Sequence, residues 1–189
     1  IDKELVEIID VEKILEEISP SPTTISSNIS TSTISEDLGD RLILIADDSA
    51  VARNQVKRAL EGLGVQMHLV NNGREALTYL QETAAACQNS VTDKVGLLIS
   101  DIEMPEKDGF IFREALLADQ ALKDIPFLFY TSHNNAFFIQ RGLDLRAIDY
   151  IQKNIPPTQF VAKIDNILTT VKEQKERSIN DLKQVADKL

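Results

Sequence analysis

The stretch LILIADDS, residues 42–49, decides the fold. Five consecutive apolar residues are followed at once by two carboxylates and a serine. An unbroken apolar run of this length is typical of a parallel strand that is buried on both faces. The polar residues after it then lie at the carboxyl end of the strand, which is where open α/β sheets bind their ligands.

Outward from this run, apolar stretches alternate with stretches of helical spacing. The expected strands are 42–46, 66–70, 95–100, 126–130 and 147–151, and the expected helices are 50–62, 74–86, 110–118, 134–142 and one starting near Pro157. Gly64 is the expected stop of the first helix. This alternation predicts an α/β fold, a doubly wound parallel sheet with helices on both faces.

Polar residues of particular types follow four of the five strands. Asp47 and Asp48 come after the first, Asp101 after the third, Thr131 after the fourth and Lys153 after the fifth. Three neighbouring carboxylates raise one another's pKa, and a hard cation such as Mg²⁺ resolves that conflict. One carboxylate can then attack phosphorus, while an ammonium and a hydroxyl stabilise the phosphoryl oxygens.

These residues stand in a recognisable order. The motifs are Asp47-Asp48-Ser49, then Asp101-Ile102-Glu103-Met104-Pro105 with Asp108-Gly109, then Thr131-Ser132, then Lys153. On these motifs the chain resembles the response-regulator receiver domain over residues 41–170. The resemblance implies a flavodoxin-like (βα)5 fold with strand order 2-1-3-4-5.

The resemblance also implies a role for each carboxylate. Asp101 is expected to accept a phosphoryl group from a histidine kinase. Asp48, Asp101 and the backbone carbonyl of Glu103 are expected to ligate Mg²⁺, and Asp47 is expected to act mainly through water. Such a domain catalyses its own phosphorylation and dephosphorylation and is not a turnover enzyme.

Three further residues receive roles from the same resemblance. Lys153 is expected to pair with the phosphoryl oxygens, and Thr131 to bond one of them after phosphorylation. Tyr150, three residues before Lys153, matches the family's switch aromatic. His133 occupies a position that tunes dephosphorylation in the family, although we expect a solvated loop residue there.

Simpler interpretations of these residues remain open at this point. Asp47, Asp48 or Ser49 can cap the first helix, and Thr131-Ser132 can cap the fourth. Tyr150 fits an ordinary core aromatic. One departure from the family affects the loop after Lys153, where Asn154 stands in place of the usual proline and a cis peptide is disfavoured.

The flanking segments narrow the expected function. Residues 1–18 look like the C-terminal remnant of a CheW-like coupling domain, residues 19–40 are a flexible linker rich in Ser and Thr, and residues 171–189 are a C-terminal helical extension. Together with a receiver at 41–170, this order resembles a CheV-type chemotaxis coupling protein. The extended last helix carries a core-facing stripe from Phe160 to Val171.

Composition excludes some functions. The net charge of -10 argues against non-specific binding of nucleic acid, and no output domain for DNA is apparent. A single cysteine, Cys87, fits a reducing cytoplasm and a position at a helix end. No apolar stretch is long enough to insert in a membrane.

The leading hypothesis is a phosphorylatable two-component adaptor of bacterial chemotaxis. Its partners would be a histidine kinase, the chemoreceptor–kinase array and its coupling protein, and phosphorylation of Asp101 would modulate receptor–kinase coupling. The alternatives are a degenerate receiver that acts as a docking module and a stand-alone response regulator. A phosphohydrolase is disfavoured, because Glu103 stands where those enzymes carry a second Asp.

Overall fold

A computed structural model describes residues 38–87 and 91–186 of the chain. The predicted coupling-domain remnant at 1–18 and nearly all of the predicted linker at 19–40 lie outside these residues. The described elements, in chain order, are β1 Leu42–Ala46, α3 Ala50–Glu61, β2 Met67–Val70, α4 Gly73–Ala86, the 3-10 turn η1 Val91–Asp93, β3 Val95–Ser100, α5 Gly109–Ala118, β4 Phe127–Thr131, α6 Ala136–Asp144, β5 Asp149–Gln152 and α7 Pro157–Ala186.

The five strands form one parallel sheet in the order β2-β1-β3-β4-β5, as predicted. Strand β1 lies between β2 and β3, so the chain winds first to one side of β1 and then to the other. Ile45 accordingly faces Leu69 on one neighbour and Ile99 on the other. The carboxyl end of β1 is therefore the switch point at which such sheets form ligand sites.

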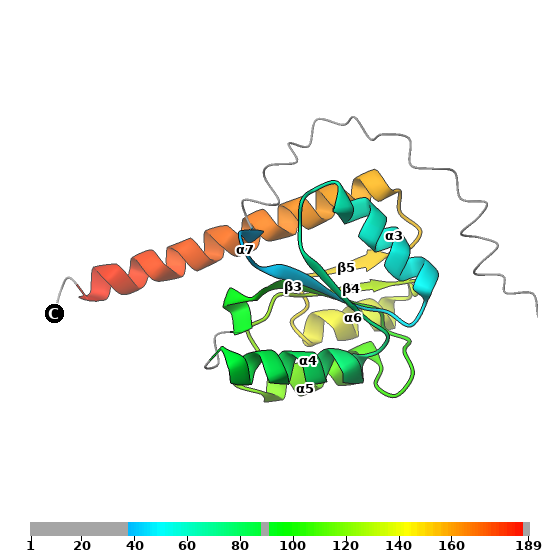
Figure 1. Cartoon of the computed structure of the whole chain (residues 1–189), viewed down its shortest axis with the longest axis horizontal. Helices are drawn as coiled ribbons and strands as arrows, with labels where there is room; N and C mark the ends of the chain where they lie inside the picture. Colours follow the sequence, from blue (N-terminus) through cyan, green and yellow to red (C-terminus); the bar gives the residue numbers. More distant parts are fainter. Residues whose placement is uncertain (1–37, 88–90, 187–189) are drawn as a thin grey trace, which may run out of the picture.

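Two apolar cores cover the two faces of the sheet. Helices α4, α5 and α6 pack on one face, and helices α3 and α7 pack on the other (Figure 1). Every residue of β3 is buried, which explains its apolar run from Val95 to Ile99. Because helices cover both faces of the sheet, polar side chains can gather only at the ends of the strands.

The helix starts follow from short polar side chains in the preceding loops. Ser49, Asn72, Asp108 and Asn135 are the N-caps of α3, α4, α5 and α6, and each accepts a hydrogen bond from a backbone N–H of the first turn. Helix α3 ends at Glu61 with Gly62 as its C-cap, earlier than the Gly64 stop expected from the sequence.

Three strands differ by one or two residues from the sequence-based prediction. Strand β2 starts at Met67 rather than 66, β4 spans Phe127–Thr131 rather than 126–130, and β5 spans Asp149–Gln152 rather than 147–151. Thr131 and Gln152 face each other at the end of the parallel ladder. Cys87 is the C-cap of α4, which agrees with the predicted helix end. The described residues contain no cis peptide bond, so the peptide bond after Lys153 is trans.

The packed domain extends further toward the N-terminus than predicted. Leu38, placed in the linker by its neighbours in sequence, is 2% exposed and belongs to the core between β1 and α7. Its side chain lies against Gly96 of β3, where an added Cβ would overlap it. Among the described residues, the packed domain therefore includes Leu38, before the predicted start at Arg41.

Helix α7 is 30 residues long and continues beyond the sheet (Figure 1). The predicted stripe is confirmed, since Phe160, Ile164 and Leu168 are buried in the core shared with α3. Farther along the helix, Lys175 forms an ion pair of 3.0 Å with Asp93 of η1. No helix among the described residues is long and apolar enough to cross a membrane.

The contact between α5 and the end of β3 leaves no room for a side chain at Gly109. A Cβ there would overlap the backbone carbonyl oxygen of Asp101, whereas a Cβ at Gly62 would meet open space. We expect Gly109→Ala to lower the free energy of unfolding by about 2–3 kcal/mol in urea titration. The control Gly62→Ala should change it by less than about 1 kcal/mol, with a gain in stability. Equal effects of the two substitutions would contradict this packing.

Candidate functional site

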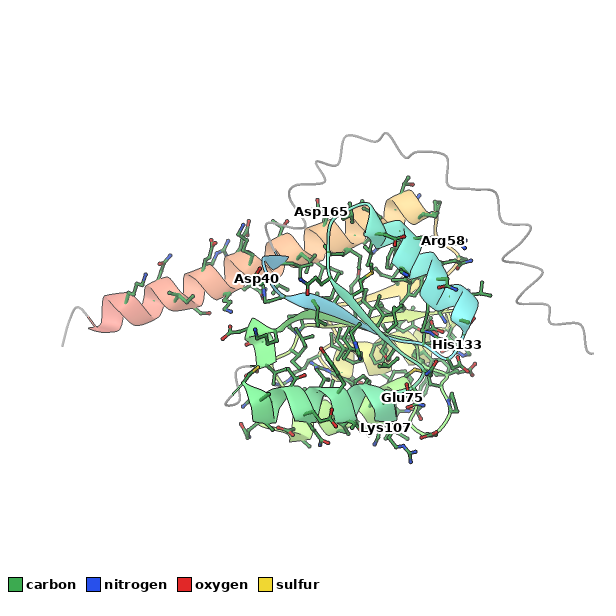
Figure 2. All side chains as sticks on the ribbon, viewed as in Figure 1. Asp40, Arg58, Glu75, Lys107, His133 and Asp165 are labelled. Carbon is green, nitrogen blue, oxygen red and sulfur yellow. The ribbon has the colours of Figure 1, made fainter. Side chains whose placement is uncertain are left out.

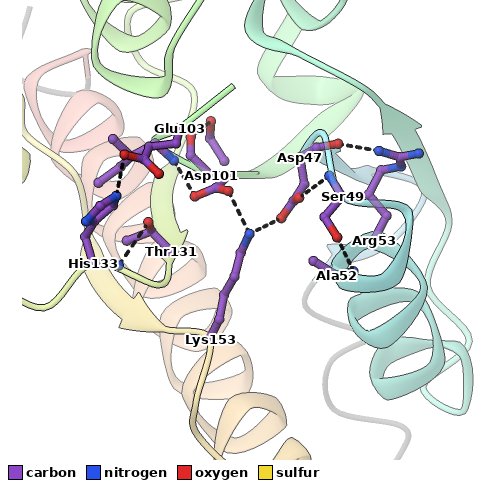
Figure 3. Close-up of polar contacts among 11 residues, drawn as sticks. Asp47, Ser49, Ala52, Arg53, Asp101, Glu103, Thr131, His133 and Lys153 are labelled. Carbon is purple, nitrogen blue, oxygen red and sulfur yellow. Dashed lines mark hydrogen bonds and ion pairs between the residues drawn. The ribbon is translucent and has the colours of Figure 1, made fainter. Parts of the chain in front are cut away.

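Side chains from three strand ends meet at the carboxyl edge of the sheet (Figure 3). Asp47 follows β1, Asp101 follows β3 and Lys153 follows β5. Backbone hydrogen bonds continue past the strand ends: Asp101 N–H donates to the Ala46 carbonyl and Lys153 N–H to the Thr131 carbonyl, both at 2.9 Å. These bonds hold the loops in register, so the three charged groups converge by topology.

The Lys153 ammonium bridges the two buried carboxylates. Its Nζ lies 2.7 Å from Oδ2 of Asp47 and 2.7 Å from Oδ2 of Asp101. Burial lowers the pKa of Lys153, but the charges of Asp47 and Asp101 raise it, and the net pKa is above its ordinary value. Lys153 is therefore a fixed positive charge at this edge, and its side chain is only 16% exposed.

Asp47 is held by its own loop as well as by Lys153. Its Oδ1 accepts a hydrogen bond of 2.9 Å from the backbone N–H of Ser49, and its backbone carbonyl accepts one of 2.5 Å from Nη1 of Arg53. Burial raises the pKa of this carboxyl, and the opposing charge of Lys153 does not fully offset that effect. The N-cap of α3 is Ser49, so the capping alternative is wrong for Asp47 and Asp48.

Both carboxylate oxygens of Asp101 are engaged. Its Oδ1 accepts a hydrogen bond of 2.6 Å from the backbone N–H of Ile102, while Oδ2 faces Lys153. The residue is 7% exposed. Strand β3 and the start of the following loop set this orientation. No helix therefore has to move to place the Asp101 carboxylate.

Asp47, Asp48 and Asp101 form the group of side chains suited to a metal ion. One ligand atom from each lies within 4.8 Å of the others, with Asp48 exposed and the other two buried. An all-carboxylate set fits a hard cation such as Mg²⁺, which keeps several waters and uses few protein ligands. The exposed Asp48 leaves one side of the group open to water and to a substrate.

Glu103 and His133, two residues beyond Asp101 and Thr131, form an outer pair at the site (Figure 3). The Oε1 of Glu103 lies 2.9 Å from Nε2 of His133, so the Glu103 side chain turns away from the three aspartates. The His133 ring also stacks on Phe138 of α6 at 4.6 Å between centroids. His133 is a loop residue, as expected, and 29% of its side chain is exposed.

Thr131 and Tyr150 both form hydrogen bonds with the backbone of His133. Thr131 is buried, and its Oγ1 accepts a hydrogen bond of 3.4 Å from the backbone N–H of His133. The hydroxyl of Tyr150 donates to the His133 carbonyl at 2.9 Å, and burial raises its pKa. Because Asn135 caps α6, the alternative that Thr131-Ser132 caps this helix is wrong.

Two contributors to the site escaped sequence reasoning. Arg53 is one turn into α3, and its contact with the Asp47 carbonyl depends on the path of the loop between them. Phe138 supports His133 from a helix that the sequence placed only approximately. A possible signal for Arg53 was its spacing of four residues from the cap Ser49, which puts it on the first turn facing the loop.

Comparisons with known proteins agree with this geometry. A family model for the response regulator receiver domain matches residues 43–165. The chemotaxis protein CheV2 of Helicobacter pylori is 29% identical over 153 residues, which cover 81% of this chain and 47% of that protein. The chain therefore spans about half the length of the curated relatives that it matches.

Two solved structures illustrate the match in three dimensions. The signal receiver domain of a histidine kinase from Syntrophus aciditrophicus is 30% identical, with a TM-score of 0.59, and covers 69% of this chain and 92% of its own. The chemotaxis response regulator CheY4 of Vibrio cholerae is 25% identical, with a TM-score of 0.58, and covers 67% and 98%.

Replacing Asp47 by Asn should stabilise the protein when no Mg²⁺ is present. The amide removes the cost of burying a second carboxylate beside Asp101, while Lys153 keeps its contact with Asp101. We expect a rise in Tm of a few degrees at neutral pH, measured by thermal unfolding. The control Asp144→Asn, at an exposed position on α6, should leave Tm nearly unchanged.

The pH dependence of this difference follows from the raised pKa of Asp47. The unfavourable contribution of the carboxylate is complete above its folded pKa and disappears as pH falls below its ordinary value of 3.8. The two proteins should therefore converge in Tm toward acidic pH. A difference that is constant with pH, or a lower Tm of the Asn variant at neutral pH, would contradict this account of the site.

Proposed function

Because the chain belongs to the response regulator receiver domain family, we propose that Asp101 accepts a phosphoryl group from a histidine kinase in the presence of Mg²⁺. The observation that carries the proposal is the Lys153 bridge between two buried carboxylates beside an exposed third, Asp48. A structural ion pair alone has no need of the third carboxylate at the same edge.

Asp101 would act as the nucleophile. One of its carboxylate oxygens forms a bond to phosphorus as the bond from phosphorus to the donor's imidazole nitrogen breaks, and the imidazole leaves with that electron pair. Asp48, Asp101 and the Glu103 backbone carbonyl would hold Mg²⁺, with Asp47 acting through water. Bound Mg²⁺ supplies positive charge against the carboxylates and the phosphoryl oxygens.

Lys153 and Thr131 would hold the transferred group. Lys153 Nζ, now shared between Asp47 and Asp101, would pair with a phosphoryl oxygen on Asp101. The Thr131 hydroxyl now accepts from His133, so its own proton remains available to donate to another phosphoryl oxygen. Both residues stand at strand ends next to Asp101, which keeps the rearrangement local.

A movement of Thr131 would be transmitted to the protein surface through His133 and Tyr150. The Tyr150 hydroxyl donates a hydrogen bond to the carbonyl of His133, and the backbone N–H of His133 donates one to the hydroxyl of Thr131. A shift of the Thr131 hydroxyl toward a phosphoryl group therefore changes the loop that Tyr150 holds. Tyr150 would thus report the state of Asp101 on the face formed by α6 and β5.

The finer proposal is a cytoplasmic adaptor of bacterial chemotaxis that modulates receptor–kinase coupling. It is supported by the likeness to CheV proteins over most of this chain and by residues 1–18, whose sequence resembles a coupling domain. The partners would be a histidine kinase and the chemoreceptor array with its coupling protein. The protein would catalyse reactions of its own Asp101 and would not be a turnover enzyme.

Replacing Asp101 by Asn should abolish phosphorylation. We expect one phosphoryl group per wild-type chain after incubation with acetyl phosphate and Mg²⁺, measured by mass spectrometry, and less than about one hundredth of that rate in the variant, because the amide is not a nucleophile. Asp181→Asn, an exposed change far along α7, is the control and should label normally.

The outcomes of this experiment separate the alternatives. Labelling of the Asp101→Asn variant at the wild-type rate would refute the proposed phosphoacceptor. Absence of labelling in the wild type, together with no change in tyrosine fluorescence or amide resonances during Mg²⁺ titration, would favour the degenerate docking module. Continuous release of phosphate over many turnovers would favour a phosphohydrolase.

Replacing Tyr150 by Phe should separate phosphorylation from its structural response. The variant should label at the wild-type rate, because the phenol does not contact Asp101. Loss of the bond to the His133 carbonyl should reduce the phosphorylation-induced amide shifts in the loop 132–135, measured by NMR. The control is Tyr79→Phe, since Tyr79 stacks on His68 away from the site. Unaltered shifts in the Tyr150→Phe variant would refute its role as a switch.

A further inference from the structure

A cavity lined by charged side chains lies at the opposite edge of the sheet from Asp101. It has a volume of about 510 Å³ and lies where α7 passes the amino ends of the strands. In Figure 1 the strands point away from the end at which α7 projects, and Figure 2 places Asp40 and His133 at opposite ends of the sheet. The cavity is therefore separate from the proposed phosphoacceptor site.

The charged residues that line this cavity are mostly cations, and we call it the basic pocket. They are Arg41, Arg113, Lys123, Arg146, Lys175 and, as the one carboxylate in the described lining, Asp124. Lys175 is already paired with Asp93, but four further cations against one anion are still unusual in a chain that carries 30 acidic and 20 basic residues. The cations come from the start of β1, from α5, from the loops before β4 and β5, and from α7, so no local run of sequence explains them.

Arg113 builds the inner wall of the basic pocket. It is 4% exposed, and its guanidinium donates to the carbonyls of Leu145, Ile125 and Arg146 at 3.1, 3.4 and 3.3 Å. Burial and the charge of Arg146 lower the pKa of Arg113 to about 10. The carbonyls satisfy its donors but leave its charge without a contacting carboxylate, so the pocket keeps an excess of positive charge.

Arg146 and Lys123 stand at the mouth of the basic pocket. Arg146 has a φ of 55°, a left-handed conformation that costs a residue with a Cβ about 1–2 kcal/mol, and Arg113 holds its carbonyl in place. Within residues 38–87 and 91–186, neither Lys123 nor Arg146 forms an ion pair. These two cations are thus positioned over the cavity without being neutralised.

The structure assigns to the basic pocket a small polyvalent anion of the phosphate class. The volume of the basic pocket falls within the range of about 300–1,000 Å³ that small-molecule sites occupy. Planar guanidinium groups match the geometry of phosphate oxygens, and several cations from separate elements favour more than one negative charge. Ile148 and Val171 add apolar wall, which leaves room for an uncharged part of the ligand.

Inorganic pyrophosphate is a suitable probe, used with the full chain and without Mg²⁺. Isothermal titration should give one site that weakens at least about tenfold between low ionic strength and about 0.5 M salt. Amide resonances of Thr92 and Ile148 should shift, whereas those of Ile102 at the phosphoacceptor edge should not. Lys123→Gln and Arg146→Asn should each weaken binding about tenfold.

Two design features keep this test specific. Asn tolerates the left-handed conformation at residue 146, so the Arg146→Asn variant should fold. Lys57→Gln removes the same charge from an exposed position on α3, and its affinity should equal that of the wild type. Absence of binding, or equal weakening by Lys57→Gln and Lys123→Gln, would overturn the assignment.

A competing occupant is the acidic segment of the chain itself. Residues 1–37 contain nine carboxylates and two lysines. If pyrophosphate binds residues 38–189 but not the full chain, that segment occupies the pocket and the assignment to a small phosphate is overturned. Residues 38–189 suit this comparison because both cores of the sheet lie within the described residues 38–186. Equal affinity of the two proteins supports the small anion.

Discussion

The ion pair of Lys153 with Asp47 and Asp101 is the interaction on which the site depends. Two buried carboxylates at one edge of a sheet repel each other and lose hydration, and each effect opposes their ionisation. An ammonium 2.7 Å from both offsets much of that cost, although the pKa of Asp47 is still raised. These contacts bring opposite charges together at one edge of the sheet, next to the exposed carboxylate of Asp48.

The strand order places these groups and also separates two regions of opposite charge. Because all five strands are parallel, the aspartates lie together at the carboxyl ends of β1 and β3, and the basic pocket around Arg113 lies at the amino ends of β1, β4 and β5. Arg113 joins α5 to the loops before β4 and β5, and β5 contains Tyr150 and is followed by Lys153. Each edge thus has its own chemistry on one rigid sheet.

Sequence reasoning reached the architecture and the polar residues at the carboxyl ends of the strands because their signals are local. A doubly buried strand shows as an unbroken apolar run such as 95–99, and a polar residue soon after it must lie at the sheet edge. The same reasoning misplaced Leu38, since burial of a single residue after a polar segment depends on β3 and α7. It also missed the stacking of His133 on Phe138, because that contact depends on the path of the loop between His133 and the start of α6.

The sequence by itself determined the order of the elements, the parallel sheet and the set Asp47, Asp48, Asp101, Thr131 and Lys153, since periodicity and motif spacing are properties of the chain. Only the tertiary structure decided which carboxylates Lys153 contacts, that Glu103 turns to His133, and that five scattered cations surround one cavity. The reason is physical: contact distances and burial depend on packing between segments that are remote in sequence, and no local pattern encodes them.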